Sequence, residues 1–175
     1  MQDTGIVRRI DELGRVVIPK ELRRTLRMRE GDPLEIYTQN NQLIFKKYSP
    51  LASLMENASA VADGIKETTD CACMVTDTDK VLYVTDNKYK HLLDQHLSSD
   101  IDKILKERRC VVINGGGYER LSLVQGGERW IEGLIVAPIA SNGDCYGAVI
   151  MVGNPAFSNA KKLVELGANF LSKQF

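Results

Sequence analysis

The sequence predicts an α+β protein of two modules, residues 1–48 and 70–175, joined by a helical connector at 49–69. The first observation is charge: residues 1–48 carry ten Lys and Arg against seven Asp and Glu, whereas residues 49–175 carry thirteen against sixteen. Such an asymmetry indicates separate modules. The second is patterning. Short β-branched runs broken by turn residues occur in both modules, while apolar residues recur at spacings of three and four in the connector.

Two β-branched runs, Gly5–Ile10 and Val16–Ile18, begin the first module, and we expect both to form strands. Pro19 suits the first turn of a helix, because its missing N–H would have no partner there. A helix is therefore predicted over Lys20–Arg29. Two further strands are expected on either side of Asn40-Asn41, a plausible tight turn because Asn tolerates positive φ. The predicted order is β-β-α-β-β.

This module is too small to be comfortably stable alone, since four strands of about five residues and one short helix bury little apolar surface. We therefore expect an obligate homodimer in which strands complete a partner's sheet. The module is also basic. Residues 5–29 hold eight of the 23 Lys and Arg residues and only three carboxylates, an excess of five positive charges in a chain of zero net charge. Positive charge this concentrated indicates nucleic acid as a partner.

The segment TGIVRRIDELGRVVIPKELRRTLRMREGDPLEIY closely resembles the DNA-binding domain of the AbrB family, and LGRVVIPKELRR is specific to that superfamily. The resemblance implies a swapped-hairpin fold, in which two chains interleave into a small β-barrel that binds double-stranded DNA. It also implies which arginines contact DNA: Arg8, Arg15, Arg23 and Arg24, with Arg9 at a further basic position. Arginine can neutralise phosphates and can also read guanine edges. The alternative from charge alone is a solvated arginine face with a few ion pairs.

The connector begins after Ser49-Pro50, which interrupts the strand pattern and suits a helix start. Its apolar residues fall on one stripe of a helix: Leu51, Leu54, Met55, Ala58, Val61, Ala62 and Ile65. The stripe is too short for a stable free coiled coil. It can pack in a bundle between subunits or dock on the second module. We favour the bundle, because the first module already requires a dimer.

The second module alternates between strand-like and helix-like runs. Strands are predicted at 71–76, 81–85, 111–113, 120–124, 133–140 and 145–152, and helices at 88–97, 100–109 and from 158. The clearest hairpin is joined by Ser141–Asp144, where Asn-Gly is a strong turn signal. An antiparallel sheet with helices at its start and end resembles a GAF sensor domain. The pattern from Trp130 to Val152 resembles the closing hairpin of that domain.

An AbrB-like module joined to a GAF-like module resembles a family of sporulation transcription factors, activators and repressors that act in the forespore. The resemblance implies a homotetramer whose GAF-like domain holds subunits together. It leaves open whether that domain senses a small-molecule effector. No run approaches the roughly 20 apolar residues of a membrane span, so we expect no membrane partner. Cysteines in apolar runs indicate reduced thiols and a cytoplasmic protein.

No motif indicates catalysis, a cofactor or a metal site, and we expect the protein not to be an enzyme. Gly115–Gly117 lacks the Lys-Ser or Lys-Thr of a phosphate loop. His91 and His96 are spaced i, i+5, which does not align them on a helix. Some GAF proteins are methionine sulfoxide reductases with cysteine nucleophiles, but thiols in apolar runs have raised pKa values and are inert. Trp130 is either core or interface packing, or the roof of a ligand pocket.

Two other classes of protein match parts of the pattern. MazE-type antitoxins share the swapped-hairpin fold, but they bind toxins through a short, acidic, disordered tail, whereas residues 70–175 are patterned as strands and helices. The other alternative is a GAF metabolite-binding protein or enzyme whose basic module only assembles it. Protease resistance of the second module argues against the antitoxin, and loss of DNA binding with retained ligand turnover favours the metabolite-binding alternative.

Overall fold

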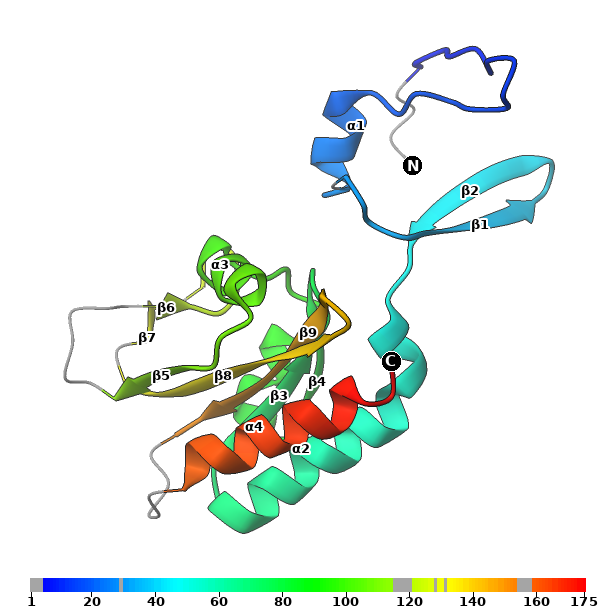
Figure 1. Cartoon of the computed structure of the whole chain (residues 1–175). Coiled ribbons are helices and arrows are strands. Elements are labelled where there is room, and N and C mark those ends of the chain that lie inside the picture. The colour runs from blue at the N-terminus through cyan, green and yellow to red at the C-terminus, as the bar shows by residue number, and fades with distance from the viewer. Residues whose placement is uncertain (1–4, 29, 115–120, 128, 131, 154–158) are drawn as a thin grey trace. The chain divides into compact units, whose positions relative to one another are not determined.

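The computed structural model describes residues 5–28, 30–114, 121–127, 129–130, 132–153 and 159–175 (Figure 1). The chain divides into two compact units, Met1–Tyr48 and Ser49–Phe175. Among the described residues, no helix is both long and apolar enough to cross a membrane. The glycine run at 115–117 lies outside the described residues.

A β-hairpin is the regular part of the first unit. β1 (Leu34–Gln39) and β2 (Gln42–Lys47) pair antiparallel along their whole length. Asn40 and Asn41 turn the chain with φ values of 48° and 61°, and two successive positive values are what a type I′ turn requires. The turn predicted at the Asn pair is confirmed.

Helix α1 (Lys20–Thr25) is shorter than the predicted Lys20–Arg29. Arg27 adopts a φ of 52°. Its amide donates to the carbonyl of Arg24 at 3.2 Å, and the amide of Met28 donates to the carbonyl of Arg23 at 2.7 Å. This pair of bonds is a Schellman motif, which ends a helix by satisfying its last carbonyls. The helix is therefore closed just after its two adjacent arginines.

The runs predicted as strands at Gly5–Ile10 and Val16–Ile18 form no ladder within the described chain. They leave apolar side chains in solvent, with exposed fractions of 86% for Val7, 70% for Ile10 and 74% for Val17. A strand must pair its N–H and C=O groups with a neighbouring strand. The strand prediction is thus wrong for the single chain, because no neighbouring segment offers an edge to these residues.

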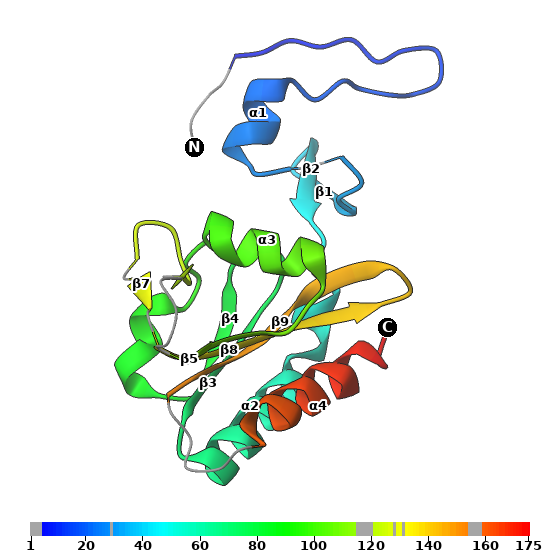
Figure 2. The same ribbon diagram turned by 60° about the vertical axis from the view of Figure 1, so that its left-hand side comes forward.

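The second unit is a five-stranded antiparallel sheet with helices on both faces (Figures 1 and 2). The strand order is β4-β3-β9-β8-β5. The strands are β3 (Ala72–Thr76), β4 (Val81–Val84), β5 (Val111–Asn114), β8 (Glu132–Ser141) and β9 (Asp144–Val152), with a separate short pair of β6 (Leu121–Ser122) and β7 (Arg129–Trp130). The sheet and its order carry the GAF-like plan that the sequence predicted.

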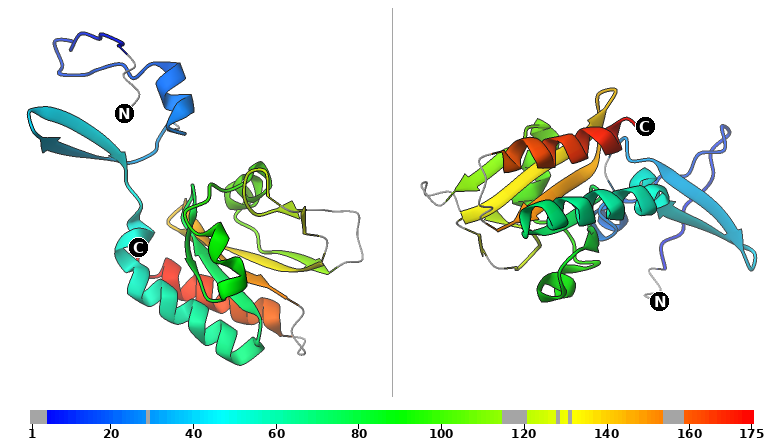
Figure 3. Two further views of the ribbon diagram at one scale, coloured as in Figure 1. Left: turned by 180° about the vertical axis from the view of Figure 1, so that it is seen from behind. Right: turned by 90° about the horizontal axis from the view of Figure 1, so that it is seen from below.

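Two helical layers enclose this sheet. Helices α2 (Met55–Thr69) and α4 (Ala160–Ser172) lie side by side on one face, as Figure 3 shows from below. Helix α3 (Ser99–Glu107) covers the other face (Figure 2). Two 3₁₀ helices complete the unit, η1 (Pro50–Leu54) before α2 and η2 (Asn87–Leu92) after β4. The helix predicted over 88–97 is wrong beyond Leu92, where the chain becomes irregular.

The β8–β9 hairpin is confirmed at its predicted turn, where Asn142 and Gly143 have φ values of 52° and 90°. Four residues on, Gly147 has a φ of 153°, and a Cβ there would overlap the backbone carbonyl of Thr76 on β3. A glycine is needed at this position because β3 and β9 approach too closely for any side chain.

Each face of the sheet has its own apolar core. One core includes Met74, Leu97, Ile101 and Leu123 under α3, and the other lies under α2 and α4. The connector stripe belongs to the second core: Leu51, Ala58, Ala62 and Ile65 are buried there, and Met55 and Val61 pack against it. The stripe therefore docks on the second module of its own chain, the alternative that the sequence favoured less.

Candidate nucleic-acid interface

The five arginines predicted to contact DNA are all exposed. Arg8 and Arg9 lie on the extended N-terminal segment, Arg15 follows the tight turn, and Arg23 and Arg24 lie on α1. Within the described residues, the only one of the five in an ion pair is Arg15. Four guanidiniums are thus available for an external anion. Which of them touch DNA stays a prediction.

Asp11 organises the turn that carries Arg15. One carboxylate oxygen accepts from the amides of Leu13 at 3.0 Å and Arg15 at 2.8 Å, while the other accepts from Arg15 Nε at 2.8 Å. The backbone closes the same turn, because the Asp11 amide donates to the Arg15 carbonyl at 3.0 Å. The Arg15 amide and then its guanidinium lower the pKa of Asp11 below its usual 3.8. Only Nε of Arg15 is engaged, so its two terminal NH₂ groups point to no partner in the turn.

An open apolar groove of about 420 Å³ lies within the first unit. It brings together the N-terminal segment, α1 and β2, which are far apart in sequence. Its lining residues are Ile6, Arg8, Val16, Val17, Ile18, Pro19, Leu22, Leu26, Met28 and Phe45. A small unit that leaves such a surface in water lacks part of its core.

The cysteines of the second unit are not activated. Burial raises the pKa of Cys73 to about 12 and that of Cys110 to about 11, and it also raises the pKa values of Cys71 and Cys145. A thiol with a raised pKa is a poor nucleophile at neutral pH. Among the described residues, no group of three or more His, Cys, Asp or Glu side chains could hold a metal ion.

The sequence analysis missed Asp11 as a structural partner and treated it only as an opposing charge. A signal was present, because Asp followed by Gly three residues later is typical of a turn closed by its own side chain. The analysis also placed Arg23 and Arg24 on a helix continuing to residue 29, whereas their carbonyls take part in the helix stop. Trp130 lies in β7, and the described structure does not decide its role.

A compact basic unit with exposed arginines, followed by a sheet with helices on both faces, defines a DNA-recognition module fused to a GAF-like domain. Residues 53–175 match the family model described as "Stage V sporulation protein T C-terminal, transcription factor". The chain is also 38% identical to stage V sporulation protein T of Bacillus subtilis strain 168, over 99% of this chain and 98% of that protein. The chain therefore belongs to the stage V sporulation protein T family of transcription factors, which regulate sporulation.

Two other comparisons describe the modules separately. The transition state regulatory protein AbrB of Bacillus subtilis strain 168 is 52% identical over 66 residues, 38% of this chain and 69% of that protein. The GAF domain from Acinetobacter phosphoenolpyruvate-protein phosphotransferase has a TM-score of 0.51 at 11% identity, covering 73% of this chain and 93% of that one. These similarities confirm the predicted α+β architecture of an AbrB-like module and a GAF-like module.

A second family model, described as "Antidote-toxin recognition MazE, bacterial antitoxin", matches residues 7–52. That match is confined to the basic module and the start of the connector. The rest of the chain, from residue 53 to its last residue, matches the sporulation transcription factor. The antitoxin alternative therefore has support only in the module that both classes share.

Proposed function

We propose that this chain regulates sporulation genes by binding double-stranded DNA through the first unit of a homodimer. The contacts come from Arg8, Arg9, Arg15, Arg23 and Arg24. The observation that carries the proposal is that these arginines are exposed and that, among the described residues, only Arg15 is paired. Guanidiniums held on a closed turn and a capped helix neutralise phosphates at fixed positions, and some can read guanine edges.

The dimer follows from what the first unit leaves uncovered. Val7, Ile10 and Val17 are exposed, the groove beside them is apolar, and the N-terminal segments pair with no strand of the described chain. Interleaving two chains would give these segments strand partners and cover the groove in one step. Each arginine would then occur twice, related by the dimer axis, which suits a DNA site with two-fold symmetry.

The second unit would join two such dimers into a tetramer. Leu166 and Phe170 lie one turn apart on α4 with exposed fractions of 65% and 49%. Large apolar side chains at i, i+4 on an outer helix face suit packing against another helix. Two tethered dimers would bind paired DNA sites more tightly than one. The unreactive cysteines support a regulatory role for this unit without enzymatic activity, in a protein of the cytoplasm.

A gel-shift assay with the full chain tests the proposal. Arg23→Ala should weaken binding to promoter DNA clearly, whereas Lys46→Ala, which removes an equal charge from exposed β2, should bind nearly as wild type. Size-exclusion chromatography with light scattering shows whether each variant keeps its assembly state. Wild-type affinity for Arg23→Ala and Arg15→Ala across a salt titration would remove the assignment of these arginines.

A further inference from the structure

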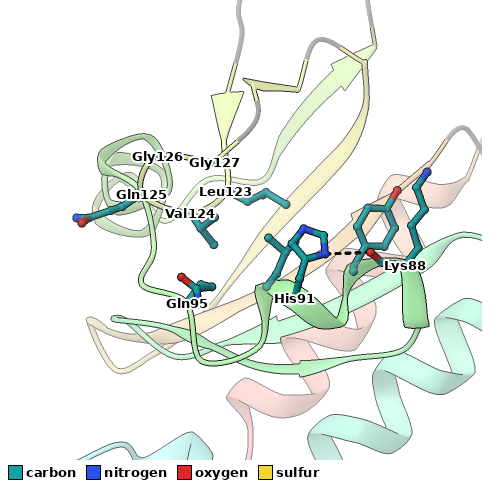
Figure 4. A pocket seen from close by; sticks show the side chains of 10 residues that line it. Lys88, His91, Gln95, Leu123, Val124, Gln125, Gly126 and Gly127 are labelled. Carbon is teal, nitrogen blue, oxygen red and sulfur yellow. Dashed lines mark hydrogen bonds between the residues drawn. The ribbon is translucent and has the colours of Figure 1, made fainter.

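A cavity of about 600 Å³ lies in the second unit, between η2 and the loop at 123–127 (Figure 4). Its described lining residues are Lys88, Tyr89, His91, Leu92, Gln95, Leu123, Val124, Gln125, Gly126 and Gly127. We propose that this cavity binds a small organic anion with a flat apolar body, and that the anion acts as the effector of the DNA-binding protein. The effector role rests on the proposed function, whereas the binding itself does not.

The floor of the cavity is apolar and belongs to the core under α3. Leu92, Leu123 and Val124 are buried, and Leu123 exposes only 2% of its surface. Tyr89 packs against the same core. Cavities of about 300–1,000 Å³ with an apolar lining and a few polar groups are typical of small-molecule sites. The floor therefore suits the apolar part of a metabolite rather than a hydrated ion.

The polar groups at the rim favour an anion. Lys88 and His91 line the cavity, and none of its described lining residues is acidic. Figure 4 shows His91 between Lys88 and the loop at 123–127. Nδ1 of His91 lies 3.0 Å from the carbonyl oxygen of Lys88, and since a carbonyl only accepts, Nδ1 carries the proton. That bond orients the ring and leaves Nε2 for an occupant, to which a protonated His91 would donate.

The opposite rim is a closed turn. The amide of Gly127 donates to the carbonyl of Val124 at 3.1 Å, and the Ser122 hydroxyl donates to the carbonyls of Val124 at 2.8 Å and Gly127 at 3.2 Å. The amide of Gln125 donates to the carbonyl of His96 at 3.0 Å, which ties the loop to the segment after η2. A Cβ at Gly127 would lie 2.6 Å from Val124 Cγ2. The rim is thus formed in advance, which lowers the entropic cost of binding.

The cavity is connected to the helix that follows the DNA-binding unit in sequence. η2 begins directly after Asp86, whose carboxylate accepts from the amide of Lys88 at 2.8 Å. Lys66 on α2 donates to the carbonyl of Thr85 at 3.0 Å and lies 4.0 Å from Asp86 Oδ2. An anion that engages Lys88 would therefore act on a segment that α2 holds. To regulate, it must favour one position of α2 over another.

Calorimetric titration of the full chain with indole-3-acetate and phenyl phosphate tests the site, with indole-3-acetamide as the uncharged match. We expect binding of at least one anion, and about 10- to 100-fold weaker binding by a Lys88→Gln, His91→Gln variant, the range for losing hydrogen bonds to a charged group. Lys90→Gln, an exposed position on η2 outside the lining, should bind as wild type, and all variants should keep the wild-type melting temperature.

Three results would overturn the site: no binding of either anion at millimolar concentration, equal binding of indole-3-acetamide, or equal loss in Lys90→Gln. Hydrogen exchange of α2 then tests the effector role. The anion should change exchange in wild type, and Lys66→Gln should abolish that change while keeping the affinity. An unchanged α2 in wild type would reject the effector role. Wild-type DNA binding by Arg23→Ala would reject the proposed function but leave the anion titration standing.

Discussion

Replacing Asp11 by Asn separates the positioning of Arg15 from simple electrostatics. Asn keeps one oxygen that can accept from the amides of Leu13 and Arg15, but its NH₂ group cannot accept from Arg15 Nε, which now lies 2.8 Å from the carboxylate. The change also makes each subunit one unit more positive. Electrostatics alone therefore predicts tighter DNA binding, whereas loss of the oriented guanidinium predicts weaker binding. We expect weaker binding.

Complete loss of Arg15 sets the upper limit of this effect. One arginine per subunit is two per dimer, so the slope of log affinity against log salt should fall by up to about 1.8. Between 50 and 200 mM salt, wild type would then lose about 12-fold more affinity than the variant. Fluorescence anisotropy of labelled promoter DNA measures both quantities. Glu12→Gln is the matched control, since it removes the same charge from an exposed neighbour and should tighten binding slightly. Tighter binding by both variants would refute the positioning role of Asp11.

Three further predictions concern acidity and stability. The pKa of Asp11 lies below 3.8, so its bonds to the turn persist above that pH and are lost as pH falls through the lowered pKa; carboxyl NMR titration should show this value returning towards 3.8 in Arg15→Ala. Leu51→Ala, at a fully buried side chain of η1, should destabilise the second unit by about 2–5 kcal/mol in urea unfolding, whereas Leu166→Ala on the exposed face of α4 should have little effect on the unfolding of that unit. Cys73 is fully buried with a pKa of about 12, so iodoacetamide at pH 8 should modify it only after denaturation, and rapid labelling of the native protein would contradict its burial.

The local parts of the fold were predictable because their causes are local. Asn40-Asn41 and Asn142-Gly143 carry the backbone preferences of their turns, and both hairpins form there. The arginines were predictable as an exposed basic cluster because charge is excluded from cores. The order of the second module followed from strand and turn signals. In each case a few neighbouring residues contain the whole instruction.

The remaining features depend on residues distant in sequence or on a second chain. Residues 5–10 and 16–18 have a strand pattern but no strand to pair with in one chain, so only a partner can complete them. The cavity joins η2 to the loop at 123–127, and no periodicity relates two segments so far apart. The docking of the connector on its own module depended on α4 and β3 forming a matching surface, which the spacing of apolar residues cannot show.

The salt dependence of DNA affinity tests the central claim most directly, because each phosphate contact contributes about 0.9 to the slope. The measurement compares wild type with a variant in which Arg8, Arg9, Arg15, Arg23 and Arg24 are all replaced by Ala, at unchanged oligomeric state. We predict a steep slope for wild type and a nearly flat one, with little residual affinity, for the variant. An equal slope in the two proteins would show that DNA is bound elsewhere on the chain.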